Sequence, residues 1–121
     1  MATILVNTGR AIVTNRINGG GTIPQFVGWG TGAGTSGQTD TTLFAEVLPR
    51  TSGTTSQQTT NTANDTFQVV GAIVAGVNET ITNAGLFDAS TAGNLFVKGD
   101  FTGIALNIGD SIQFTFKISF S

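Results

Sequence analysis

The chain ends in the stretch DSIQFTFKISFS, residues 110–121, in which every second residue from Ile112 to Phe120 is large and apolar. The residues between them are polar, so a side-chain period of two places the apolar groups on one face of a β-strand. A helical period would scatter the same groups around the circumference. The stretch therefore predicts a half-buried strand. The turn signal Gly109-Asp110 before it predicts a hairpin with the segment immediately upstream.

Other segments of the chain carry strand patterns as well, separated in the second half by turn signals at intervals of roughly 8–12 residues. Strands are predicted over residues 24–29, 66–77, 80–87 and 95–101, and the polar tract 50–60 is predicted as an outer or edge strand. Residues 66–77 are apolar on both faces, which is typical of a central strand or of one covered by another subunit. These patterns predict an all-β fold, an antiparallel β-sandwich (jelly-roll-like), as a single domain over residues 1–121.

The remaining segments are one helix, an N-terminal arm and a loop. Apolar residues at helical spacing predict one short helix over residues 8–17, ended by the glycines at 19–21. Residues 2–6 are interpreted as a first strand, and residues 1–8 alternatively as an extended arm. Residues 30–40 form a Gly/Thr-rich loop that is either mobile or packed against a partner, and residues 41–46 form a short strand or a single helical turn.

The composition argues against several classes of function. The 121 residues include no cysteine and no histidine, which removes the usual thiolate nucleophile, zinc ligands and general base. Only 10% of the residues are charged, and the five basic ones are far apart, which disfavours nucleic-acid binding. The apolar run at residues 2–6 is too short for a signal peptide or a membrane-spanning helix. We therefore expect a protein that is not an enzyme, uses no cofactor or metal, does not contact a membrane, and is made in the cytoplasm.

The motifs that suggest chemistry each have a simpler structural explanation. The glycine-rich run at residues 28–34 lacks the Gly-Lys-Ser/Thr ending and the following helix of a phosphate-binding loop. Trp29 is suited to stacking on a sugar, but a tryptophan at a strand end more often fills the core. The seven carboxylates mostly fall at predicted turns, where they cap backbone N–H groups. Arg50 is predicted to pair with Glu46 or with an acidic group of a neighbouring chain, or to be solvated.

Five segments together resemble small structural proteins of tailed bacteriophages. They are VGWGTGAG at residues 27–34, NDTFQVVG at 64–71, AGLFDA at 84–89, GNLFV at 93–97 and GDSIQFTF at 109–116. The resemblance covers most of residues 6–120, and it implies a virion component made in the host cytoplasm. It implies no catalytic residues for this chain. Similar β-rich modules serve as capsid decoration proteins and as tail or fibre parts.

We favour a capsid decoration (cement) protein on the capsid surface, in which small interfaces on a repeating lattice add up by avidity. Its trimeric state is implied by the resemblance alone. Its expected partners are further copies of itself and the major capsid protein or another virion protein. The alternatives are a tail, knob or fibre-associated protein, and a glycan-binding module that uses Trp29. The candidate interface residues are Thr3, Ile4, Leu5, Trp29, Thr31, Thr35 and Arg50.

Overall fold

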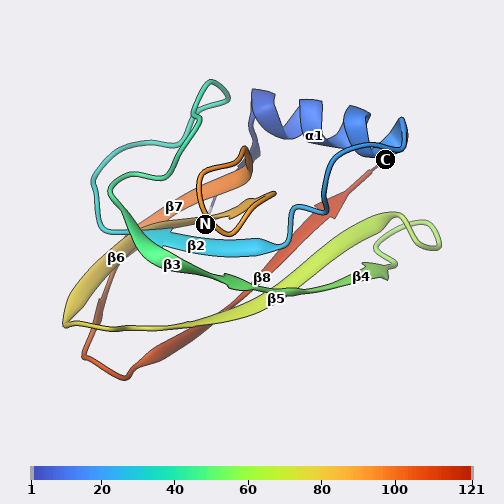
Figure 1. Cartoon of the computed structure of the whole chain (residues 1–121). Coiled ribbons are helices and arrows are strands. Elements are labelled where there is room, and N and C mark those ends of the chain that lie inside the picture. The colour runs from blue at the N-terminus through green and yellow to red at the C-terminus, as the bar shows by residue number, and fades with distance from the viewer. Residues whose placement is uncertain (1, 121) are drawn as a thin grey trace.

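Two antiparallel sheets and one helix make up the computed structural model, which describes residues 2–120 (Figure 1). The elements are β1 Ala2–Leu5, α1 Asn7–Ile17, β2 Phe26–Gly30, β3 Glu46–Ser52, β4 Thr54–Gln58, β5 Thr66–Val74, β6 Glu79–Phe87, β7 Leu95–Leu106 and β8 Ser111–Ser119. The first sheet has the strand order β1-β7-β6-β2-β3, and the second has the order β4-β5-β8. The expected all-β antiparallel sandwich with one short helix is confirmed.

The terminal strand β8 pairs with β5, from Thr66 opposite Ser119 to Val74 opposite Ser111. The predicted hairpin with the upstream segment is therefore wrong, because β7 belongs to the other sheet, where it pairs with β6 and β1. The Gly109-Asp110 turn carries the chain across between the sheets. It is held by hydrogen bonds from the Gly109 N–H to the Ala75 carbonyl (2.8 Å) and from the Ala75 N–H to the Asp110 carbonyl (2.7 Å).

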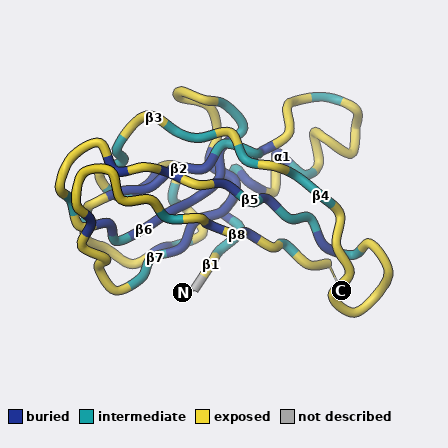
Figure 2. Tube along the Cα trace, turned by 90° about the horizontal axis from the view of Figure 1, so that it is seen from below, coloured by how far each residue is buried: buried dark blue, intermediate teal, exposed yellow. Residues whose placement is uncertain are grey.

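The core lies between the two sheets, as the buried positions in Figure 2 indicate. Trp29 on β2 is 1% exposed and meets the Phe114 ring of β8 edge-on, with the ring centroids 6.4 Å apart. Phe116 is also buried, so the alternation predicted for the terminal stretch places its central aromatic residues in the core. The interpretation of Trp29 as a core residue is confirmed.

Strand β5 is the middle strand of its sheet, but toward its C-terminal end only one of its faces is buried. Val69 and Ile73 point into the core, whereas Ala72 and Val74 on the opposite face are exposed. The apolar outer face that suggested a covering subunit is therefore open in the isolated chain.

The N-terminal residues belong to the sheet. Residues 2–5 form edge strand β1, which pairs with β7 from Ala2 opposite Asp100 to Leu5 opposite Val97, so they are not an extended arm. Residue 1 of the predicted arm lies outside the described residues. The helix α1 spans Asn7–Ile17, as predicted, and packs so closely on β7 that a side chain at Gly9 would collide with the Phe96 carbonyl. No helix of the described residues is long and apolar enough to cross a membrane.

Residues 41–60 differ in part from expectation. The polar tract 50–60 holds the end of edge strand β3 and the whole of edge strand β4, and the chain passes from one sheet to the other at Gly53. The strand or helical turn predicted for residues 41–46 is wrong as far as residue 45, because β3 begins only at Glu46. The side chain of Asn83 bonds to both the N–H and the carbonyl of Phe44, so this backbone needs no strand partner.

Candidate interaction surface

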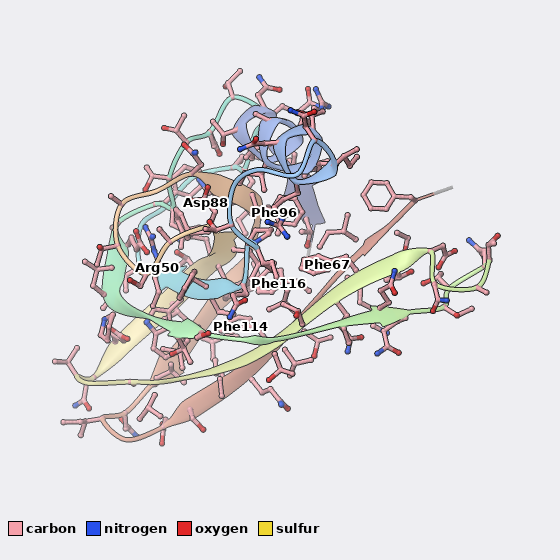
Figure 3. All side chains as sticks on the ribbon, turned by 45° about the vertical axis from the view of Figure 1, so that its right-hand side comes forward. Arg50, Phe67, Asp88, Phe96, Phe114 and Phe116 are labelled. Atoms are coloured by element: carbon pink, nitrogen blue, oxygen red, sulfur yellow. The ribbon has the colours of Figure 1, made fainter. Side chains whose placement is uncertain are left out.

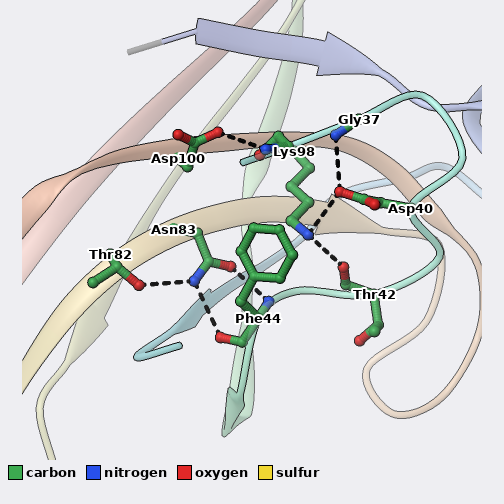
Figure 4. A network of polar contacts seen from close by, with 9 residues as sticks. Gly37, Asp40, Thr42, Phe44, Thr82, Asn83, Lys98 and Asp100 are labelled. Carbon is green, nitrogen blue, oxygen red and sulfur yellow. Dashed lines mark hydrogen bonds and ion pairs between the residues drawn. The ribbon is translucent and has the colours of Figure 1, made fainter. Parts of the chain in front are cut away.

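The long loop between β2 and β3, residues 31–45, is anchored to the first sheet by a buried lysine (Figure 4). The Lys98 side chain on β7 is 0% exposed, and its Nζ donates to Asp40 Oδ2 (3.0 Å) and to the Thr42 carbonyl (2.9 Å). The ammonium also lies 3.2 Å from the centroid of the Phe44 ring. A buried ammonium needs such partners because its desolvation is costly. The loop that we expected to be mobile or partner-bound is therefore held by its own chain.

A second anchor of the same loop comes from β6. Asn83 is fully buried; its Oδ1 accepts from the Phe44 N–H (3.0 Å), and its Nδ2 donates to the Phe44 carbonyl (3.1 Å). The hydroxyl of Thr82 donates to the Gly32 carbonyl. These side chains satisfy buried backbone groups that would otherwise be unpaired, so they serve the loop's structure.

Two carboxylates of this region are stabilised in their ionised form. The Gly37 N–H and, next in size, the Lys98 ammonium hold the pKa of Asp40 below its usual value. The Ser36 N–H, 2.9 Å from Asp100 Oδ1, lowers the pKa of Asp100 in the same way. Neither carboxyl has the raised pKa of a general acid.

The turn before β5 contains a third carboxylate of this kind. Asp65 accepts the backbone N–H groups of Thr62 (2.9 Å), Thr60 (2.8 Å) and Asn61 (2.9 Å), and these bonds lower its pKa strongly. As pH falls, the unfolded chain binds the proton first, so the stability that Asp65 contributes is present above about pH 4 and lost below it.

We predict that Asp65→Asn lowers the melting temperature near pH 6, and that the difference from the unmodified chain narrows progressively as the pH falls from about 4 toward 2. Thermal unfolding followed by circular dichroism across this range measures both curves. A constant difference at all pH values would contradict the role assigned to the Asp65 carboxylate.

Arg50 is fully engaged inside the chain (Figure 3). Its side chain is 4% exposed and forms a two-pronged ion pair with Glu46, at 2.6 and 3.0 Å. It also donates to the carbonyls of Ala89 (2.8 Å) and Ala92 (2.7 Å), and its guanidinium lies 3.4 Å from the centroid of the Phe87 ring. Of the three alternatives for Arg50, the pairing with Glu46 is confirmed, and it ties β3 to the turn between β6 and β7.

A groove of about 450 Å³, here called the α1 groove, opens between the helix and the second sheet. Phe96 of β7 and Phe67 of β5 lie at its base, with ring centroids 6.2 Å apart, and Figure 3 labels both. Ile17 is 80% exposed and Phe120 is 54% exposed at its rim. Its lining is almost entirely apolar: Ile12, Val13, Arg16, Ile17, Ile23, Pro24, Thr55, Phe67, Phe96 and Phe120. Such a surface suits apolar contact and offers little for binding a polar substrate.

Sequence reasoning missed the α1 groove. The available signal was the pair of large aliphatic residues, Ile17 and Ile23, on either side of the glycines at 19–21. The partners of these residues, Phe67 and Phe96, come from distant strands, and no local pattern links them to the helix.

The predicted interface residues come from β1, β2, β3 and the loop between β2 and β3. Thr3 on β1 and Thr31 and Thr35 on the loop are exposed, whereas Ile4 and Leu5 are half-buried. The side chains of Trp29 and Arg50 are occupied inside the chain. Among residues 2–120, no three carboxylates are grouped so as to hold a metal ion.

The fold and these sites define a small β-rich protein whose polar clusters stabilise its own loops. A family model for the podophage GP4 fiber I protein gp80 matches residues 9–118, and the chain belongs to this family. This match supports a small β-rich structural protein of phage virions. No curated protein and no solved structure matches the chain. The family match favours the tail, knob or fibre alternative over the capsid decoration protein that we preferred from the sequence.

Proposed function

We propose that this chain is a non-catalytic structural subunit of a phage fibre or of a fibre-associated part of the tail. The observation that carries the proposal is the family match, which covers α1 from Gly9 onward, every strand from β2 to β7 in full and nearly all of β8. The virion is its location, and other virion proteins and further copies of itself are its partners.

The internal chemistry supports a structural role. The buried charged and polar side chains, such as Lys98 and Asn83, bind the backbone or charges of the loop at residues 31–45. The ionised carboxylates Asp40, Asp65 and Asp100 accept hydrogen bonds from backbone N–H groups nearby. Side chains committed in this way fix loops and leave few groups for acid–base chemistry.

Thr3, Ile4, Leu5, Thr31 and Thr35 stay candidates for contacts with another virion protein. The three-fold symmetry that the resemblance implies stays a prediction.

We predict that labelled copies of this chain appear on fibres or at the tail in electron micrographs of the particle. Quantitative mass spectrometry of purified virions is expected to give tens of copies per particle or fewer. Hundreds of copies spread over the head would contradict the proposal and restore the capsid decoration hypothesis. Glycan binding by the purified chain would instead favour the glycan-binding alternative.

A further inference from the structure

Strand β8 is the longest edge strand with one side unpaired. It has nine residues, and within residues 2–120 it pairs only with β5. The other edge strands are less available: β1 has four residues, β4 has five, and β3 contains Pro49 and a register irregularity opposite β2. Soluble proteins usually protect long edges with prolines, bulges or several charges. β8 has no proline, pairs in an uninterrupted register and carries one charge, Lys117.

The hydrogen bonds at the two ends of β8 show which residues face the open edge. The Ala75 N–H donates to the Asp110 carbonyl, and the Phe120 N–H donates to the Asp65 carbonyl, at positions that continue the β5–β8 register. Backbone groups alternate in direction along a strand, so the even-numbered residues of β8 point their N–H and C=O toward β5. The odd-numbered residues point theirs to the open edge: Ser111, Gln113, Thr115, Lys117 and Ser119.

We propose that this edge pairs antiparallel with the same edge of a second copy, about a two-fold axis at Thr115. Thr115 is the midpoint of β8, so only this register overlaps the whole strand. It places Thr115 opposite the partner's Thr115, Gln113 opposite the partner's Lys117, and Ser111 opposite the partner's Ser119. The N–H and C=O groups on the open edge of one copy then face the C=O and N–H groups on the open edge of the other copy.

The same register matches the side chains on both faces. On the core side, Phe114 lies beside the partner's Phe116, and Ile112 lies beside the partner's Ile118, so the apolar row continues across the two copies. On the outer face the two lysines are separated, whereas a two-fold axis at Lys117 would place like charges directly opposite each other.

A second copy would also bury apolar surface that is exposed beside the open edge of β8. A hollow between β7 and β8 is lined by Phe101, Ile104 and Phe114 among others. Ile104 is 42% exposed, in the part of β7 that extends beyond its pairing with β1. A second copy on this side of the sandwich would therefore both pair with β8 and cover the exposed apolar hollow.

Single-cysteine crosslinking tests the register, because the chain has no cysteine of its own. Facing Cα atoms in a hydrogen-bonded antiparallel pair are about 5.5 Å apart, which a disulfide spans. Thr115→Cys is expected to form a covalent dimer under mild oxidation, whereas Ser111→Cys alone is not. Mixing Ser111→Cys with Ser119→Cys is expected to restore crosslinking. Equal crosslinking of Thr115→Cys and Ser111→Cys would overturn the proposed register.

Sedimentation equilibrium of the full chain tests the association itself. The unmodified chain is expected to be a reversible dimer. Gln113→Glu, on the exposed outer face, would create two cross-strand ion pairs and tighten the dimer about two- to thirtyfold. Gln113→Lys at the same position is expected to weaken it by a similar factor. A monomer at all concentrations, a trimer, or a dimer that neither substitution affects would overturn the proposal.

Discussion

Trp29→Ala is expected to lower the free energy of unfolding by about 3–5 kcal/mol, the usual range for removing a large aromatic side chain from a core. Trp29 is 1% exposed and belongs to the first sheet, and its ring meets Phe114 of the second sheet. Removing the Trp29 ring would leave a cavity between the two sheets. The cavity could close only if both sheets shifted. Chemical denaturation followed by circular dichroism measures the change and does not depend on tryptophan fluorescence.

Trp29→Phe is the matched control, because it keeps an aromatic ring in the same space and should lose clearly less stability than the alanine variant. This pair of variants also tests the prediction that Trp29 belongs to an interface. If Trp29→Ala stayed as stable as the unmodified chain but no longer assembled, Trp29 would act in assembly and the core assignment would be wrong.

The sequence predicted the strands better than it predicted their partners. The alternation from Ile112 to Ile118 correctly indicates which face of β8 is buried, since that depends only on local periodicity, whereas Phe120 lies beyond the strand and is exposed. The partner of β8 is a strand about 45 residues earlier, as Val70 opposite Thr115 shows, and pairing over such a distance leaves no mark in local turn signals. For this reason the Gly109-Asp110 turn suggested a hairpin where the chain crosses between sheets.

The polar clusters around Arg50 and Lys98 likewise show that local sequence patterns do not predict distant partners. The pair Glu46 and Arg50 is four residues apart, so it was among the alternatives for Arg50. Lys98 follows the apolar residues Leu95–Val97 on β7, and its partner Asp40 lies in a distant loop. Lysines are rarely fully buried, so nothing local suggested that this one anchors the loop at residues 31–45.

Asp40→Ala is expected to lower the free energy of unfolding by about 3 kcal/mol, because it leaves the ammonium of Lys98 buried without its negative partner. The Lys98 side chain is 0% exposed, whereas that of Asp40 is 24% exposed. Removing the Asp40 carboxylate therefore leaves the Lys98 ammonium unpaired and out of contact with water. Removing the ammonium leaves a carboxylate that water still reaches. Lys98→Met, which keeps most of the buried stem, should consequently cost less than Asp40→Ala.

The double variant Asp40→Ala with Lys98→Met separates this cause from a simple loss of packing. No unpaired charge remains buried in it, so it should be more stable than Asp40→Ala alone even though it carries one more substitution. Urea denaturation of the four chains gives the coupling between the two sites. If the two single losses simply added, Lys98 would not depend on Asp40, and the Thr42 carbonyl and the Phe44 ring would suffice to hold the ammonium inside the protein.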